Sequence, residues 1–513
     1  MRDIIINNQL DEATKKILMQ EKELKDKDKK IKELEQEVEY LKGQILGKNK
    51  KIFGKSSEKS IDISVFDEAE KNSDKKVEEP EIEEITYSRK KPSNYVGKKE
   101  NLKELEVVEI IHEIDEKNCE KCNLELKSIG TKEKQILKYI PARVYIEKHI
   151  SHSYKCSCDE VIVSAQKPKT LLHKSLASNE LLSHVINLKY QHALPLYRQE
   201  NYFKMLGVNI SRQTLSNWIM YASDELKKVC DFMKNDLIKS NYIQADETTV
   251  QVINEKGEET KSKKYMWLYK NKNIVIFDYQ KTRSSSCPKN FLGDYKGYLQ
   301  TDGYSGYNSV SNAKRVYCLA HIRRKYHEIL VTLNDNAKKN SISMVAFNYC
   351  NKLYDIERQI RDEYSKEDNF YEVRKSIRNE KSKGILIEFM DFVERNIEDS
   401  APKLKNALQY SKKLLPSMML ILEDGSIEID NNGAERAIKP FVIGRKNWLF
   451  SNTSKGANAS AIIYSIIESA KCNNLLVEKY LLYVIDKLSN DEDVDICDIV
   501  PYSSTLPNEL KLT

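Results

Sequence analysis

Five β-rich segments in the middle of the chain constrain its fold most, because two of them carry an aspartate. The first three alternate apolar and polar side chains and are separated by turns, which predicts a meander of three strands. Asp246 falls inside the first segment and Asp302 near the end of the fourth. A carboxylate within a strand is costly to bury unless it is paired or binds a metal ion. The predicted strands span residues 242–252, 265–269, 274–279, 297–303 and 316–319.

A third acid, Glu435, lies in the polar stretch 430–450. The sequence predicts a short helix here, which Asn431 or Asn432 can cap and Pro440 ends. A carboxylate in a cationic and aromatic surface suits a metal site that works on a polyanion. The alternative is a capped surface helix with solvated charges. The surrounding side chains are Arg436, Lys439, Arg445, Lys446, Trp448 and Phe450.

Two strand-borne aspartates and one helix-borne glutamate can hold two divalent cations for phosphoryl transfer. One ion lowers the pKa of a water or 3′-hydroxyl nucleophile, and the other stabilises the leaving oxygen. Hard oxygen ligands favour Mg²⁺, with Mn²⁺ as a substitute. The three acids are far apart in the sequence, so only the fold can bring them together.

A seven-residue apolar repeat near the N-terminus predicts a left-handed coiled coil. Because such a seam needs a partner helix, we expect self-association, most simply as two strands. The residues from about 58 to 104 are charged and carry few large apolar groups, which predicts a flexible linker. The first seam is formed by Leu10, Ile17, Leu24, Ile31, Val38, Ile45 and Ile52.

Two short cysteine pairs predict a structural Zn²⁺ site. Alternating segments at 135–140 and 143–150 lie between the pairs and predict a hairpin-like bridge. The first pair has the standard two-residue spacer, whereas the one-residue spacer of the second strains tetrahedral closure. His149 or His152 could therefore replace one ligand, and four reduced, unligated cysteines are the alternative. The paired cysteines are Cys119, Cys122, Cys156 and Cys158.

Residues 202–219 predict two helices joined by a glycine-containing turn, with Ser211 as the N-cap of the second helix. Arg212, Gln213 and Asn217 would point outward and could reach base edges or phosphates. A plain helical hairpin is the alternative. Further helices are predicted within 332–425, which would be an all-α insertion, and after residue 455.

The net charge of +6 over 513 residues excludes a uniformly basic nucleic-acid coat. Any surface for a polyanion must therefore come from local clustering. No apolar run reaches the length of a membrane span, and the N-terminus lacks the apolar core of a signal peptide. We expect a cytosolic protein, associated with the nucleoid when it binds DNA.

The chain resembles IS66-family transposases over nearly its whole length, with the motifs in the family's order. The resemblance implies an RNase H-like core with Asp246, Asp302 and Glu435 as its acidic triad. It also implies metal-dependent cleavage at element ends and strand transfer into target DNA without a covalent enzyme intermediate, and small accessory proteins as partners. One departure is the second cysteine pair, where the family usually has a two-residue spacer. Besides the cysteines, the motifs are KIFGKSSEK (51–59), LPLYRQE (194–200), ADET (245–248), TDGY (301–304), AHIRRK (320–325) and the stretch 430–450.

By this resemblance, Asp246 is expected to bridge two ions, while Asp302 and Glu435 each hold one. Four basic side chains would neutralise phosphates, namely those of Lys325, Arg436, Arg445 and Lys446. Trp448 would either stack on an unpaired base or belong to the core, and His321 would either orient the scissile phosphate or cap a helix. The expected DNA-binding residues are Arg212, Gln213, Asn217, His321, Arg323, Arg324, Lys325, Arg436, Arg445, Lys446 and Trp448.

The predicted fold is a multidomain α+β chain. Two other functions remain open: an RNase H-like nuclease or resolvase that cuts without joining, and a non-catalytic dimeric DNA-binding regulator. The expected parts are a coiled coil (8–53), a flexible linker (54–104), a zinc-ribbon-like module (105–168), a helix-turn-helix-like domain (169–238), an RNase H-like core in two pieces (239–331 and 429–474), an all-α insertion (332–428) and a C-terminal helical tail (475–513).

Overall fold

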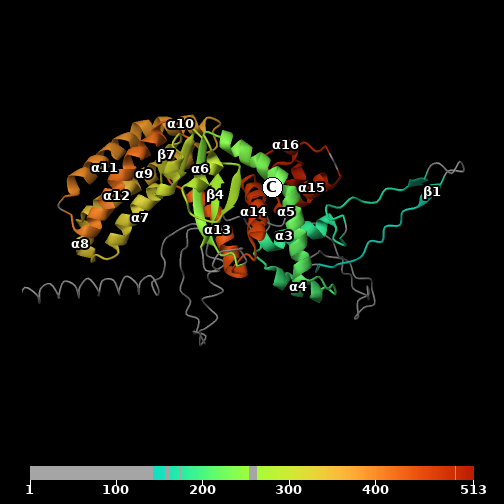
Figure 1. Cartoon of the computed structure of the whole chain (residues 1–513). Helices are drawn as coiled ribbons and strands as arrows, with labels where there is room; N and C mark the ends of the chain where they lie inside the picture. Colours follow the sequence, from blue (N-terminus) through green and yellow to red (C-terminus); the bar gives the residue numbers. More distant parts are fainter. Residues whose placement is uncertain are drawn as a thin grey trace, which may run out of the picture. The chain divides into compact units, whose positions relative to one another are not determined.

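The computed structural model describes residues 142–155, 162–173, 175–253, 263–398, 400–490 and 493–512. They form a mixed α+β fold (Figure 1). The predicted coiled coil, the predicted linker and all four paired cysteines lie outside these residues. No helix among the described residues is long and apolar enough to cross a membrane.

A five-stranded sheet is the centre of the fold, and its order is β5-β4-β3-β6-β7. All five predicted strands are confirmed, with their ends shifted by one or two residues. The first three form the expected antiparallel meander, whereas β6 and β7 run parallel to β3. The strands are β3 (Tyr242–Val250), β4 (Lys264–Lys270), β5 (Val275–Gln280), β6 (Tyr298–Thr301) and β7 (Lys314–Tyr317).

The register between β3 and β6 places two of the predicted site residues at one end of the sheet. Gln244 of β3 lies opposite Gln300 of β6 in a parallel pair. Asp246 and Asp302 each follow two residues later, so both lie just beyond the last parallel pair of β3 and β6, on the carboxyl side of that pairing. Ligand sites of open α/β sheets usually form on this side.

Helices from the two ends of the described chain pack on the β5 side of the sheet (Figure 1). Helix α14 lies along β5, where the hydroxyls of Ser465 and Ser469 accept hydrogen bonds from the backbone of Phe277 and Val275, each at 2.8 Å. The unpaired edge of the sheet is thereby covered. These helices are α3 (Asn179–Tyr190), α4 (Leu196–Met205), α5 (Arg212–Lys239), α14 (Ser454–Cys472), α15 (Val477–Asn490) and α16 (Ile496–Ile499), followed by η4 (Asn508–Leu510).

Helices α4 and α5 form the predicted helix–turn–helix segment. Gly207 ends the first helix with φ of 85°, a left-handed conformation that glycine adopts without strain. Ser211 caps the second helix, because its hydroxyl accepts a hydrogen bond from the backbone of Thr214 at 3.1 Å. The predicted N-cap is therefore confirmed.

A second group of helices packs on the β7 side of the sheet. Between residues 332 and 428 the described chain has no strand, as the predicted all-α insertion requires. Its core includes Tyr298 and Val316 of the sheet, so the apolar interior is continuous with the strands. Its elements are α7 (Leu319–Leu330), α8 (Asp335–Lys339), α9 (Ile342–Tyr364), α10 (Phe370–Ile377), the π-helical η2 (Arg378–Ser382), α11 (Lys383–Asn396), α12 (Pro402–Met418) and η3 (Met419–Leu422). Helix α6 (Ser286–Leu292) and η1 (Ser305–Ser309) precede this group in the chain and pack in the other core.

Helix α13 (Asn432–Trp448) carries Glu435 in its first turn and continues past Pro440. The prediction that Pro440 ends the helix is wrong. A proline in a helix removes one hydrogen bond, but Ile438 and Phe441 on either side are buried in the core and hold the helix together. The side chain of Asn431 makes no capping bond. Asp430 instead accepts a hydrogen bond from the backbone of Asn432 at 3.0 Å.

A two-stranded hairpin precedes the helices. Its strands, β1 (Ser153–Lys155) and β2 (Ile162–Ser164), are antiparallel, and the second cysteine pair lies in the undescribed connection between them. The segment 143–150, expected to be one half of the hairpin-like bridge between the cysteine pairs, has no regular secondary structure, and the other half, 135–140, lies outside the described residues.

Candidate active site

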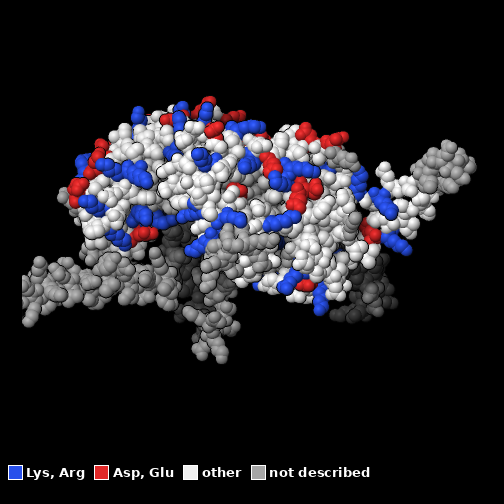
Figure 2. All heavy atoms as spheres, in the orientation of Figure 1, with Lys and Arg blue, Asp and Glu red and all other residues white. Residues whose placement is uncertain are grey.

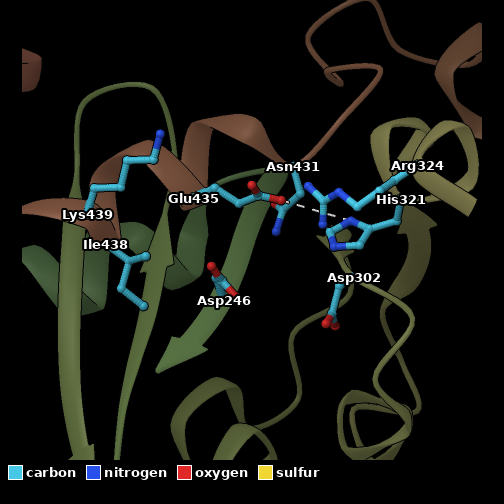
Figure 3. A pocket seen from close by; sticks show the side chains of 8 residues that line it. All are labelled: Asp246, Asp302, His321, Arg324, Asn431, Glu435, Ile438 and Lys439. Carbon is cyan, nitrogen blue, oxygen red and sulfur yellow. Dashed lines mark ion pairs between the residues drawn. The ribbon is translucent and has the colours of Figure 1, made fainter. Parts of the chain in front are cut away.

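The three predicted catalytic acids line one pocket (Figure 3). Asp246 comes from the middle of β3, Asp302 from the residue after β6 and Glu435 from the first turn of α13. The pocket has a volume of about 270 Å³. Its other lining residues are His321, Arg324, Asn431, Ile438 and Lys439.

Buried amides hold the two strands and the start of α13 together. Gln244 donates from Nε2 to Gln300 Oε1 and to the main-chain oxygen of Asp430, both at 3.0 Å. Gln300 in turn donates to the main-chain oxygen of Glu428 at 2.8 Å. Because both glutamines are buried, these bonds are shielded from water. They fix the chain segment that leads into α13 against the strands that carry the aspartates.

Asn431 makes a second connection between α13 and β3. Its Nδ2 donates to the main-chain oxygen of Ala245 at 2.9 Å, next to Asp246. Asn431 is only 1% exposed, and it lines the pocket. The neighbouring Gly433 lets the helix approach β3 closely, since a β-carbon there would stand 2.2 Å from Gln244 Oε1.

A buried carboxylate below the pocket orders the loop that follows Asp302. Glu247 accepts hydrogen bonds from Arg283 Nε at 2.8 Å and from the Tyr307 hydroxyl at 2.5 Å. The Arg283 guanidinium also lies over the ring of Tyr304, 3.9 Å from its centroid. Within the loop, Asp302 Oδ1 accepts from the backbone of Tyr304 at 2.9 Å. The orientation of Asp302 therefore depends on a cluster that does not itself line the pocket.

The electrostatics of the pocket favour a bound cation. Burial raises the pKa of Asp246 to about 7, and the negative charges of Glu247, Asp302 and Glu435 add to this shift. Burial also lowers the pKa of His321, aided by the charge of Arg324. A carboxylate crowded by like charges binds a proton more readily, and it gains equally from a divalent cation.

Three buried polar atoms of this pocket have no hydrogen-bond partner: Glu435 Oε1, His321 Nδ1 and Asn431 Oδ1. His321 Nδ1 lies 3.9 Å from Glu435 Oε1 (Figure 3). Unsatisfied buried groups are costly, and such groups gathered in one place indicate a ligand. Carboxylate and amide oxygens are the ligands that Mg²⁺ and Mn²⁺ prefer, so the residues present fit a hard divalent cation.

The basic residues expected to contact DNA fall into two groups. Arg324 lines the pocket, and Lys325, Arg436 and Lys446 are exposed. Arg323, by contrast, faces α9, where it donates to Asn351 Oδ1 at 2.9 Å. The other member of this second group is Arg445, which binds Thr248 and Thr249 of β3.

Of the remaining predicted DNA-binding residues, three are exposed, whereas His321, which lines the pocket, and Trp448 are half-buried. Arg212, Gln213 and Asn217 lie on the exposed face of the first turns of α5, where the latter two are hydrogen bonded to each other at 3.1 Å. Trp448 is half-buried and packs edge-on against Phe441, with ring centroids 5.6 Å apart. This packing corresponds to the core alternative for Trp448. On the face in Figure 2, basic and acidic side chains are interspersed.

Sequence reasoning missed two residues of this region. Asn431 was expected only as a helix cap, and Cys318 had no expected role. The thiol of Cys318 is buried, which raises its pKa to about 12, and Sγ accepts a hydrogen bond from the backbone of Asn431 at 3.1 Å. The spacing of Cys318 and His321 at the start of α7 was the available signal, since side chains three residues apart share a helix face.

Comparison with known proteins agrees with the geometry of the pocket. The model of a family described as "Transposase IS66 family" matches residues 174–459, which is more than half of the chain and includes all three acids. The chain belongs to the IS66 transposase family. A second model, the zinc-finger binding domain of transposase IS66, matches residues 116–159, the range that contains all four paired cysteines. The two matches support a transposase that uses metal ions and has DNA as a partner.

This transposase also resembles three proteins of Sinorhizobium fredii that are described as uncharacterized. Protein y4qI is 27% identical over 375 residues, which cover 69% of this chain and 67% of the relative. Protein y4hP is 24% identical over 74% of this chain and 71% of its own length. Protein y4jD is 25% identical over 75% and 77%, respectively.

Proposed function

We propose that the chain is a DDE-type transposase that binds the ends of its insertion element, cleaves them and transfers the ends into target DNA. The observation that carries this proposal is the pocket lined by Asp246, Asp302 and Glu435. Membership of the IS66 family supports the same reaction. In this proposal the sheet with α13 and α14 is an RNase H-like core, and residues 332–428 are an insertion in it.

Asp246 would bridge two Mg²⁺ or Mn²⁺ ions, and Asp302 and Glu435 would each hold one. When bound, such a pair of ions activates the attacking oxygen and stabilises the leaving oxygen. Arg324 and Lys439 line the pocket beside the acids and can neutralise a DNA phosphate there. Burial lowers the pKa of His321, which favours the neutral ring, and the N–H of that ring can donate one hydrogen bond to orient the scissile phosphate.

Other parts of the chain would bind DNA and other protein chains. The exposed first turn of α5 would contact DNA through Arg212, Gln213 and Asn217. Exposed Lys325, Arg436 and Lys446 would extend the phosphate-binding surface. The cysteine module, residues 105–168, would hold a structural Zn²⁺, and the coiled coil, residues 8–53, would join two copies. Small proteins encoded by the same element would assist.

The second candidate is an RNase H-like nuclease or resolvase. It shares the acids but lacks strand transfer, so the products of the reaction discriminate between the two. A regulator that only binds DNA would work without the acids.

The decisive experiment incubates the full chain with labelled element-end DNA, target plasmid and Mg²⁺. We expect cleaved ends and joined products from the wild type, and neither from the Asp246→Asn variant, which should still bind the DNA. Exposed Asp294 provides the matched control, because Asp294→Asn should leave both products unchanged. Cleavage without joining would favour the nuclease, and unchanged activity of Asp246→Asn would overturn the proposal.

A further inference from the structure

We propose that Cys318, His321 and Glu435 form a second cation site, which selects thiophilic divalent ions such as Zn²⁺, Cd²⁺ or Co²⁺. The site lies beside the acidic triad and shares Glu435 with it. Its binding chemistry is independent of the proposed transposase reaction, and only its effect on activity rests on that reaction.

The geometry is that of a three-ligand site. One ligand atom of each residue lies within 4.8 Å of the others, and His321 Nδ1 lies 3.9 Å from Glu435 Oε1. Cys318 and His321 come from the start of α7, and Glu435 comes from the first turn of α13. Three protein ligands with one open position are typical of zinc sites that exchange ligands.

Two of the three ligand atoms are otherwise unsatisfied. His321 Nδ1 and Glu435 Oε1 are both buried and have no hydrogen-bond partner. A third unpartnered atom, Asn431 Oδ1, belongs to a side chain that is 1% exposed and lines the same pocket. The amide nitrogen of Asn431 donates a hydrogen bond to the main-chain oxygen of Ala245. This bond fixes the orientation of the amide group and therefore of its unpartnered oxygen. A cation held by His321 and Glu435 would satisfy the unpartnered atoms of both residues.

The sulfur ligand determines which ions the site would prefer. Cys318 Sγ receives the backbone N–H of Asn431 at 3.1 Å, and Cys318 occupies the N-cap position of α7, a helix of 12 residues. Both the hydrogen bond and the helix N-terminus stabilise a thiolate once a metal displaces the proton. Thiolate and imidazole favour Zn²⁺, Cd²⁺ and Co²⁺, whereas Mg²⁺ takes oxygen ligands.

Because Glu435 cannot serve both sites fully, a thiophilic ion would withdraw a ligand from the Mg²⁺ pair. The cysteine, histidine and glutamate would therefore make the enzyme sensitive to inhibition by thiophilic ions in the presence of Mg²⁺.

The test measures cobalt bound to the full chain after dialysis, together with its sulfur-to-cobalt charge-transfer absorption. We expect Cys318→Ser to bind one Co²⁺ fewer than the wild type. Cys350 is the matched control, because it is an equally buried free cysteine in the insertion core, and Cys350→Ser should bind as much cobalt as the wild type. Cobalt held by the paired cysteines is common to the wild type and both variants, so it does not affect the difference in bound cobalt between them.

His321→Gln provides a second variant in case Cys318→Ser does not fold. Loss of this ligand should weaken the binding of the additional Co²⁺ by roughly tenfold or more. Equal cobalt binding by the wild type and either variant would overturn the site. Asp246→Asn separates the two proposals, since it should lose cleavage of element ends but keep the additional cobalt.

Discussion

Gly433 of α13 lies so close to Gln244 of β3 that a β-carbon at residue 433 would stand 2.2 Å from Gln244 Oε1. Gln244 cannot swing away without cost, because its amide nitrogen is hydrogen bonded to Gln300 and to the Asp430 main chain. This close approach sets the distance between the helix that carries Glu435 and the strand that carries Asp246.

Gly433→Ala should therefore displace α13 and reduce cleavage, with a loss of about 1–3 kcal/mol in the free energy of unfolding. Gly384→Ala is the control, because a β-carbon there meets nothing within 4 Å. Combined with Gln244→Ala, the Gly433→Ala change should cost less than it does alone, measured as a double-mutant cycle by chemical denaturation. Strictly additive costs would show that the two residues do not compete for space.

The pKa of about 7 for Asp246 predicts how stability depends on pH in Mg²⁺-free buffer. The folded state retains a proton on Asp246 that the unfolded state loses near the ordinary value of 3.8, so folding is favoured at low pH and this contribution is lost as pH rises toward 7. The melting temperature of the wild type should therefore fall between pH 5 and pH 8 more steeply than the melting temperature of Asp246→Asn. If the melting temperatures of the two proteins changed in parallel with pH, the pKa of Asp246 would not be raised in the folded state.

Adding Mg²⁺ should reverse this trend for the wild type. The cation binds the deprotonated carboxylates, so its stabilising effect should grow as pH rises through 7. Mg²⁺ should stabilise the Asp246→Asn variant much less. An equal gain in both proteins would place the bound ion elsewhere.

Glu357 pairs with two buried arginines of the insertion and should be essential for its stability. Glu357 Oε2 accepts from Arg374 Nη2 at 2.7 Å and Oε1 accepts from Arg378 Nε at 2.6 Å, and all three side chains are at most 3% exposed. Glu357→Gln should cost about 3–5 kcal/mol, because Arg378 stays buried without its carboxylate partner, whereas Arg374 keeps its pair with Glu428. Glu394→Gln, which breaks the exposed pair with Lys412, should change the melting temperature little.

The arginines hold the pKa of Glu357 below its ordinary value despite its burial. Its contribution is therefore present at neutral pH and is lost as pH falls through the folded-state pKa. Lowering the pH should reduce the difference in the free energy of unfolding between the wild type and Glu357→Gln. A difference that did not change with pH would contradict the ion pairs.

Glu247 should affect metal binding although it does not line the pocket. Glu247→Gln would weaken the bonds to Arg283 and Tyr307 that order the loop after Asp302. We expect the affinity for Mn²⁺ to fall by about 10–100-fold, measured by paramagnetic resonance titration. Tyr307→Phe removes only one of these bonds and should have a smaller effect. Unchanged Mn²⁺ affinity in both variants would separate this cluster from the site.

Local sequence signals predicted the elements of this fold well. The strands that carry Asp246 and precede Asp302, and the cap at Ser211, depend on alternation and on a single side-chain bond, which neighbouring residues determine. Asp246 and Asp302 were singled out because a carboxylate within or near a strand is costly to bury without a partner, and Glu435 because it lies in a cationic and aromatic stretch. Their convergence depends on the parallel register of Gln244 with Gln300, which joins segments that no local pattern connects.

Tertiary packing explains the features that the sequence did not reveal. Pro440 is a local stop signal, but the burial of Phe441 outweighs the lost hydrogen bond. Asn431 resembles a cap in the sequence, yet its Nδ2 donates to the carbonyl oxygen of Ala245, far away along the chain, and its side chain makes no capping bond to α13. Trp448 and Arg445 belong to a polar, basic stretch, so only the neighbouring strand and core show that they anchor α13.

The shared interior of the insertion and the sheet has a practical consequence for dissecting this protein. Tyr298 and Val316 of the strands pack with Phe389 and Leu408 of the insertion, so the helices cannot be excised as a module. A truncated chain without them would expose the apolar flank of β6 and β7 and would be expected to aggregate. Inactivity of such a truncation would report a collapsed scaffold, and point substitutions within the intact chain are the sounder way to assign roles to the insertion.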